Sequence, residues 1–248
     1  MSVMTAFPPI TLDELVGEAA LLTRLDRKYL VPATELDGLL DRMPSGVRML
    51  EIDSRRSFSY RSIYFDTAGL ESYHAAAHGR RRRFKIRIRT YLDSGLDFVE
   101  VKTRGARGVT IKERIPYAGD GSRLGSEGEA YASEVLTGAG ICAEGHEYAP
   151  VMATYYRRTT LFVPETGSRV TIDSDLAWML PDGSTLRMPD SVVVETKSAR
   201  AASDVDRLLW SLGHRPSRIS KYATGLAALR PDLPANKWHG VLRRHFTP

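Results

Sequence analysis

The sequence predicts an α+β fold centred on an eight-stranded antiparallel β-barrel, a tunnel, with flanking helices. Three observations predict it. Charged and apolar residues alternate in about eight segments, turn signals such as "DSG" and "GARG" separate some of these segments, and helical patterns lie between others. About eight antiparallel strands can close on themselves and so remove the edges of their sheet. If the apolar faces pack outward against helices, the charged faces line the interior.

The first part of the chain is expected to alternate between helices and strands. Residues 11–22 predict a short helix, since a threonine can cap it and acids follow in its first turn. Residues 24–31 predict a strand, and residues 33–43 a helix whose leucines face inward. Aromatic and β-branched residues predict a strand at residues 58–67, and a short helical turn is expected at residues 69–79.

The middle of the chain is expected to form an antiparallel meander of residues 81–91, 96–104 and 108–117. The elements after it follow from hairpin turns, a closing glycine and helical spacing. They are a helix at 130–138, strands at 151–163, 169–180 and 191–198, and helices at 202–213 and 217–229.

The stretch "RRRFKIRIRTY", residues 81–91, alternates cations with apolar residues. A strand alternates faces with period two, so Lys85, Arg87 and Arg89 share one side and the isoleucines the other. A sheet that is wet on its charged side would show the same alternation. In a closed barrel, however, unpaired cations would be strongly penalised, and water and a chain of phosphates would relieve that cost. Carboxylates beside the phosphates would then need a bridging divalent cation.

Composition limits the classes of protein that fit. With one cysteine, Cys142, the chain can form neither an intramolecular disulfide nor a cysteine-based zinc cluster, which suits the cytoplasm. The sequence predicts no exported and no membrane-spanning segment. A net charge of +5 permits anionic partners. Nucleic acid is not expected, because the basic faces carry mostly charge rather than stacking aromatic residues.

An ordered set of motifs resembles a known family. The motifs are "RLDRKY", "SIYFDT", "RFKIRIRTY", "FVEVKTR", "VTIKER", "YYRR", "RVTIDSDLAW", "VVVETKS" and "ISKY". Together they resemble the VTC domain, a branch of the triphosphate tunnel metalloenzyme superfamily, from about Arg24 to Tyr222. The resemblance implies an eight-stranded tunnel flanked by helices. We expect one domain over residues 1–248 with its core at about 24–230.

The resemblance implies phosphate-binding positions at Lys28, Arg87, Arg89, Lys102, Arg158 and Lys221 and a metal-binding position at Glu195. The other residues named below are expected from the charged faces of the predicted strands. As catalytic cations we expect Lys28, Arg87, Arg89 and Lys102. As further phosphate-binding residues we expect Arg24, Lys112, Arg158, Lys197 and Lys221. As ligands of Mn²⁺ or Mg²⁺ we expect Glu195, Glu100 and Asp173.

Several of these residues have simpler interpretations. Glu100 could pair with Lys102 or a nearby arginine instead of a metal, and Asp173 could cap a turn. Lys221 could be a surface lysine, although a cation at a helix start makes more sense beside a bound anion. Tyr64 and Asp66 are expected to be structural.

Eukaryotic relatives in the VTC branch make polyphosphate from ATP, so the resemblance implies metal-assisted phosphoryl transfer onto a growing chain. The alternatives are a hydrolase of triphosphate or polyphosphate and a binding module without catalysis. The hydrolytic branch commonly begins with Glu-x-Glu-x-Lys, whereas this chain has "RLDRK", which makes a second metal site harder to build. ATP, triphosphate or polyphosphate are the expected partners, and an accessory protein is compatible with the sequence.

Overall fold

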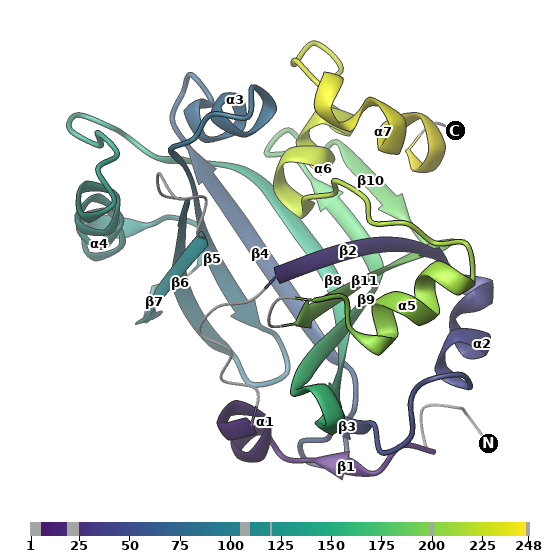
Figure 1. Cartoon of the computed structure of the whole chain (residues 1–248). Helices are drawn as coiled ribbons and strands as arrows, with labels where there is room; N and C mark the ends of the chain where they lie inside the picture. The colour runs from purple at the N-terminus through teal and green to yellow at the C-terminus, as the bar shows by residue number, and fades with distance from the viewer. Residues whose placement is uncertain (1–5, 19–24, 105–109, 120, 199–200, 247–248) are drawn as a thin grey trace. The chain divides into compact units, whose positions relative to one another are not determined.

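The computed structural model describes residues 6–18, 25–104, 110–119, 121–198 and 201–246. It divides into two compact units (Figure 1). Unit 1 comprises Met1–Phe58, Tyr156–Leu176 and Met188–Arg218, and unit 2 comprises Ser59–Tyr155, Ala177–Arg187 and Ile219–Pro248. The prediction of a single domain stays a prediction.

The described residues form eleven strands and seven α-helices. The strands are β1 (Pro9–Ile10), β2 (Leu25–Pro32), β3 (Arg48–Leu50), β4 (Phe58–Asp66), β5 (Arg83–Tyr91), β6 (Leu96–Arg104), β7 (Thr110–Tyr117), β8 (Ala149–Val163), β9 (Ser168–Met179), β10 (Thr185–Met188) and β11 (Ser191–Ser198). The helices are α1 (Leu12–Glu18), α2 (Leu36–Leu40), α3 (Glu71–Ala77), α4 (Gly125–Gly138), α5 (Asp204–Ser211), α6 (Lys221–Leu229) and α7 (His239–His245).

The α+β fold class is confirmed, and all eight predicted strands are present. They pair in the order β2-β11-β9-β8-β4-β5-β6-β7, and the short β1, β3 and β10 lie off this path. In this order β2 and β7 are the two ends, so the sheet of the described residues is open and the closed barrel is a correction. The residues of β7 are largely exposed, and its Pro116 has no backbone N–H for a further ladder.

In unit 1, α2 and α5 cover one face of the strands. Alternate residues of β2, β11, β9 and β8 pack there against leucines of α2 and against Val205 and Leu209 of α5. Tyr29 and Val31 of β2 belong to this buried cluster. Because strand residues alternate, Lys28 lies on the opposite face of the same strand.

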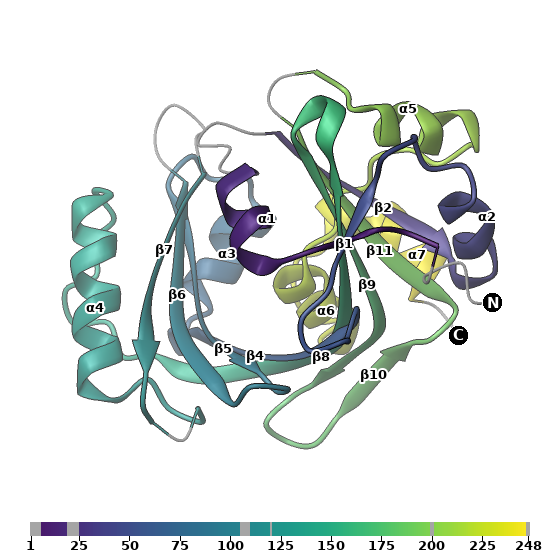
Figure 2. The ribbon, with the colours of Figure 1, turned by 90° about the horizontal axis from the view of Figure 1, so that it is seen from below.

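In unit 2, α4 covers the apolar face of β5 and β6 (Figure 2). Phe84, Ile86 and Ile88 are buried against Val135 and Leu136 of the helix. The helix begins five residues before the predicted range, because the stretch "GSEGE" forms its first turn. The prediction that the isoleucines of the basic strand face a helix is therefore confirmed.

A buried carboxylate joins α3 to the end of β4. Asp66 accepts backbone hydrogen bonds from Thr67, Ser72 and Tyr73, each of 2.9 Å, and a bond of 2.5 Å from the Tyr222 hydroxyl on α6. Burial raises the pKa of Asp66, and these hydrogen bonds oppose the shift. The structural role predicted for Asp66 is confirmed.

Candidate active site

The meander of unit 2 carries a dense group of cations. The register sets Lys85, Lys102 and Lys112 side by side across β5, β6 and β7. The next row contains Arg87, Glu100 and Arg114. We call the side of β5–β7 that faces away from α4 the basic face. Its paired rows hold eight Lys or Arg residues, four from β5 and two each from β6 and β7, and one carboxylate, Glu100.

Glu100 is fully buried at the centre of the basic face. Its Oε2 accepts a hydrogen bond of 2.8 Å from Arg87 Nε and a second bond from Arg87 Nη2. Its Oε1 lies 2.6 Å from Lys112 Nζ and 3.8 Å from Arg89 Nη1. Burial alone would raise the pKa of Glu100, but these three cations hold it well below its usual range. This arrangement agrees with the alternative interpretation of Glu100, in which it pairs with nearby cations and does not bind a metal.

Lys112 lies near the edge of the group, with 30% of its side chain exposed. Desolvation lowers its pKa to about 8, although Glu100 pulls in the opposite direction. The positive charges of Arg87 and Arg89 add to the lowering. Lys112 is thus a cation whose charge changes in a physiological pH range.

Tyr64 holds the other end of Arg87. The tyrosine hydroxyl accepts a hydrogen bond of 3.2 Å from Arg87 Nη1, and its ring stacks on Tyr222 of α6 at 5.1 Å. Arg87 is therefore held from both sides, by Tyr64 and by Glu100. The predicted structural role of Tyr64 includes positioning this arginine.

The start of α6 adds one more cation in unit 2 and contacts a lysine of the basic face. Lys85 Nζ donates a hydrogen bond of 2.7 Å to the hydroxyl of Ser220, which caps the helix, and Lys221 is the first helical residue. The carbonyl oxygen of Lys221 accepts a bond of 2.7 Å from the indole of Trp178. A helix N-terminus disfavours cations, so this arrangement suits a bound anion.

In unit 1, Glu195 lies between two lysines. Its Oε1 is 3.4 Å from Lys28 Nζ and 2.6 Å from Lys197 Nζ. The attraction of Glu195 raises the pKa of Lys28 against the effect of burial, whereas burial lowers the pKa of Lys197. Asp26 lies 3.7 Å from Lys197 Nζ. The strand register, in which Glu195 faces Lys28, places this group together.

Arg158 and Asp173 form a second ion pair in unit 1. Two hydrogen bonds, of 2.6 and 2.8 Å, join the guanidinium to the two carboxylate oxygens. Burial disfavours the charge on Arg158, but Asp173 raises its pKa well above the usual value. The carboxylate of Asp173, which is fully buried, is therefore oriented toward an arginine.

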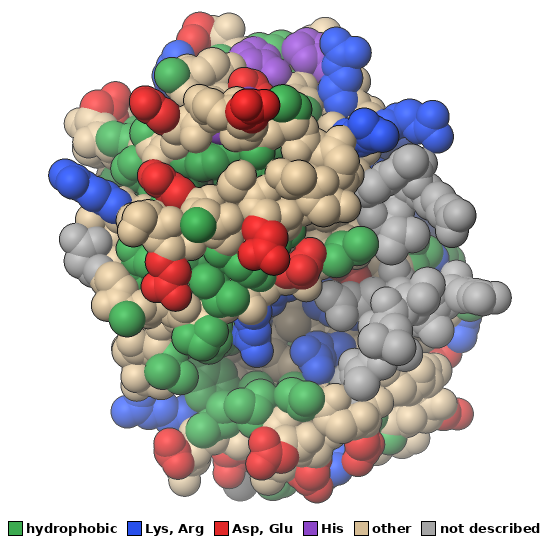
Figure 3. Space-filling model, turned by 90° about the vertical axis from the view of Figure 1, so that its left-hand side faces the viewer, with side chains coloured by type: hydrophobic (Ala, Val, Ile, Leu, Met, Phe, Trp, Pro, Cys, Tyr) green, Lys and Arg blue, Asp and Glu red, His purple; other side chains and the backbone are tan. Residues whose placement is uncertain are grey.

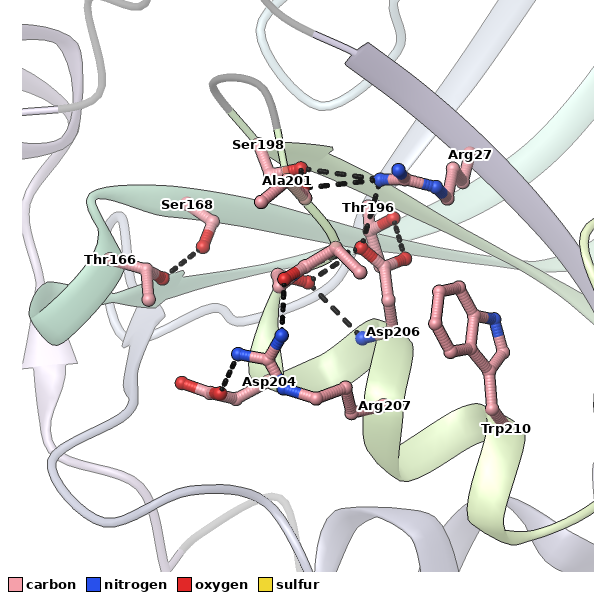
Figure 4. Close-up of polar contacts among 12 residues, drawn as sticks. Arg27, Thr166, Ser168, Thr196, Ser198, Ala201, Asp204, Asp206, Arg207 and Trp210 are labelled. Atoms are coloured by element: carbon pink, nitrogen blue, oxygen red, sulfur yellow. Dashed lines mark hydrogen bonds and ion pairs between the residues drawn. The ribbon is translucent and has the colours of Figure 1, made fainter.

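The other side of β2 and β11 is fixed to α5 by Asp206. The carboxylate of Asp206 accepts hydrogen bonds from Tyr29 (2.7 Å), Thr196 (2.6 Å) and the backbone N–H of Ser203 (2.7 Å). Arg27 lies 3.2 Å from it, and Figure 4 shows Arg27 and Thr196 converging on the start of the helix. These bonds hold the two strands that present Lys28 and Glu195.

The carboxylates fit a metal ion that takes its remaining ligands from the substrate. Within the described ranges there is no group of three or more His, Cys, Asp or Glu residues able to enclose an ion. Mg²⁺, however, is usually bound by one or two carboxylates, with phosphate oxygens and waters as its other ligands. Glu195, whose side chain is 11% exposed, fits that pattern and would be the ligand.

Comparison with known proteins identifies the family. The VTC domain family matches residues 23–230 of the 248-residue chain. The chain belongs to the VTC domain family. The resemblance drawn from the sequence motifs is thereby confirmed. No curated protein matches this VTC domain chain.

Three solved structures are similar to parts of this VTC domain. HpAC1 from Hippeastrum, a putative adenylyl cyclase described as having a dominant triphosphatase activity, is 20% identical, covers 82% of this chain and 94% of its own, and has a TM-score of 0.49. PH1819 from Pyrococcus horikoshii OT3 is 14% identical, with 84% and 98% coverage and a TM-score of 0.46. The RNA triphosphatase Pct1 of S. pombe is 9% identical, with 92% and 87% coverage and a TM-score of 0.28.

The residues predicted for the site of this VTC domain fall into both units, and their roles stay predictions. Unit 2 contains Arg87, Arg89, Lys102, Lys112, Lys221 and Glu100. Unit 1 contains Lys28, Arg158, Lys197, Glu195 and Asp173. Arg24 lies outside the described residues.

Sequence reasoning did not predict the contacts of Lys85 and Tyr64, and it gave Arg114 no role in the site. The alternation of β7 does place Arg114 on the same face as Lys112, as the sequence predicts. The bonds of Lys85 to Ser220 and of Tyr64 to Arg87 join segments far apart in the chain, so no local pattern could reveal them.

Figure 3 shows side chains of both charges on one face of the described residues. Acidic and basic side chains are intermixed there, with hydrophobic side chains between them. In the part of the chain that the structure describes, no helix has the length and apolarity to span a membrane.

Proposed function

We propose that this VTC domain is an enzyme that transfers phosphoryl groups with the help of a divalent metal, and that its reaction is polyphosphate synthesis from ATP. The observation that supports this proposal most directly is the basic face, which has eight cations and one carboxylate in its paired rows. An excess of partly buried cations is costly without an anion, and a chain of phosphates supplies regularly spaced negative charges. Family membership supports the same chemistry.

The arginines of the basic face would bind the phosphate oxygens. Arg87 is fixed by Glu100 and Tyr64, so its guanidinium loses little freedom when a phosphate arrives. Planar guanidinium groups make paired hydrogen bonds with phosphate, while Lys85, Lys102 and Lys112 add compact charge. These cations would stabilise the charge spread over the transferred phosphoryl group.

In unit 1, the group around Glu195 would bind the divalent metal. Lys28 and Lys197 lie beside the carboxylate and would bind phosphate oxygens. Mn²⁺ or Mg²⁺ held by Glu195 would neutralise phosphate charge as a Lewis acid when bound. A module that only held polyanion would gain little from this acid, which favours an enzyme over a passive binder.

The experiment is ³¹P NMR of the purified protein with ATP and Mn²⁺ or Mg²⁺. We expect a growing polyphosphate signal together with ADP. Glu195→Gln should abolish turnover, whereas Glu165→Gln, at an exposed acid of unit 1, should leave it unchanged.

Other outcomes would identify other functions. Free phosphate without chains would contradict the polymerase and support a triphosphate or polyphosphate hydrolase. Tight binding of polyphosphate with no turnover under either metal would contradict the enzyme and leave a binding module.

A further inference from the structure

The chemistry of the basic face changes along its strands. Toward the β5–β6 turn, the rows of lysine and arginine give way to aromatic residues. Tyr91 follows Arg89 on the same side of β5, Phe98 pairs with Arg89, and Tyr60 of β4 pairs with Tyr91. We call Tyr60, Tyr91 and Phe98 the aromatic row. All three lie in unit 2.

The three rings form a continuous group. The centroids of Tyr60 and Tyr91 are 5.0 Å apart, and those of Tyr91 and Phe98 are 5.7 Å apart. The Arg89 guanidinium lies 5.5 Å from the Tyr60 ring and that of Arg114 lies 4.7 Å from the Phe98 ring. Arg114 also donates a hydrogen bond of 3.3 Å to the Tyr91 hydroxyl. Planar groups of two kinds, rings and guanidiniums, are thus held together.

These rings are not part of the core of unit 2. The buried cluster beneath α4 is made from the opposite faces of β5 and β6 and does not include them. Each of the three side chains is half-buried. They therefore present ring surface on the same side of the sheet as the cations of the basic face, which is where a ligand would meet them.

We propose that the aromatic row binds the base of a nucleoside triphosphate whose phosphates lie on the basic face. This inference rests on the proposed function. It adds a site for the base, the part of the substrate that the cations would not contact. Tyr91 is four residues beyond Arg87 on β5, a separation of about 13 Å. That distance allows one ligand to place its anionic end and its planar end on different rows. Aromatic rings and guanidinium planes both stack on bases.

The test compares two ligands that share the phosphates and differ in the base. Equilibrium binding of ATP and of inorganic tripolyphosphate is measured without metal for the wild type, Tyr91→Leu, Phe98→Leu and Tyr91→Phe. We expect each leucine variant to bind ATP about 5- to 150-fold more weakly and to bind tripolyphosphate as before. Tyr91→Phe keeps the ring and should retain at least most of the ATP affinity.

Two results would overturn the aromatic row as a base site: unchanged ATP affinity in both leucine variants, or an equal loss for ATP and tripolyphosphate. The equal loss would mean that the rings merely support the sheet. A failure of the proposed function looks different, because the wild type would then bind neither ligand or would bind both without turnover in the NMR experiment.

Discussion

Glu100 is the single negative charge among the cations of the basic face. It is the one acid in the paired rows of the basic face, and Arg87, Arg89 and Lys112 surround it. Removing one partner of a buried ion pair leaves uncompensated charge, which is far more costly than losing an exposed pair. The residue therefore stabilises the free protein by holding together cations that would otherwise repel one another.

Replacement of Glu100 should test this role. We expect Glu100→Gln to lower the free energy of unfolding by about 3–5 kcal/mol, measured by urea denaturation. Tripolyphosphate should restore part of the loss, because it supplies the missing negative charge. Glu113→Gln, at an exposed position of β7, serves as the control and should change stability little. A Glu100→Gln protein as stable as the control would contradict the role.

Lys112 should make phosphate binding depend on pH. Its pKa is lowered to about 8, so it is mostly charged at pH 7 and loses its proton as the pH rises through about 8. The affinity for tripolyphosphate relative to that of Lys112→Arg should fall by up to about tenfold per pH unit above 8, because arginine stays charged. A constant ratio between pH 7 and 9.5, measured by calorimetric titration, would show that the charge of Lys112 is not used.

At the scale of the elements, α5 shows how a helix start fixes two strands. Asp206 and Ser203 form a reciprocal capping box, and Asp206 also bonds to Tyr29 of β2 and Thr196 of β11. Ser203 and Asp206 stand at the cap and third helical positions, so their pairing could be read from the sequence. The contacts of Asp206 with Tyr29 and Thr196 could not be predicted from the sequence, because they depend on where the two strands pack against the helix.

The matched variants Asp206→Ala and Asp204→Ala separate these roles. Both acids lie in the first turn of α5, but Asp204 makes a partly exposed pair with Arg207. We expect Asp206→Ala to cost about 3 kcal/mol of unfolding free energy and Asp204→Ala less than about 1. Hydrogen bonds lower the pKa of Asp206 despite burial, so its stabilisation is present at neutral pH and is lost as the pH falls through that lowered pKa. Equal effects of the two variants at pH 7 would refute the assignment.

The sequence predicted which helices and strands form better than it predicted where they end or which strands pair. Period-two alternation identified all eight long strands, because an apolar side buried under a helix leaves a clear pattern. The C-terminal helix α7 was missed, since its short sequence "HGVLRRH" has little apolar periodicity. For the same reason the two-residue and four-residue strands β1 and β10 were not expected.

For the whole molecule, alternation predicts which residues share a face but does not determine the register or the closure of the sheet. Lys85, Lys102 and Lys112 lie side by side because of the register of β5–β7, which local sequence does not encode. The barrel was inferred from the number of alternating strands and from the family resemblance, whereas the described sheet ends at β2 and β7. The family assignment was reached from the order of the motifs, and family matching confirms it.

The central claim is that the basic face binds a chain of phosphates, and calorimetric titration of tripolyphosphate without metal tests it most directly. The wild type should bind, more weakly as salt is raised, and Lys102→Gln should lose about 10- to 100-fold in affinity. Arg157→Gln, which removes an exposed cation from β8, should bind as the wild type does. No binding by the wild type, or equal affinities for the two variants, would contradict the claim.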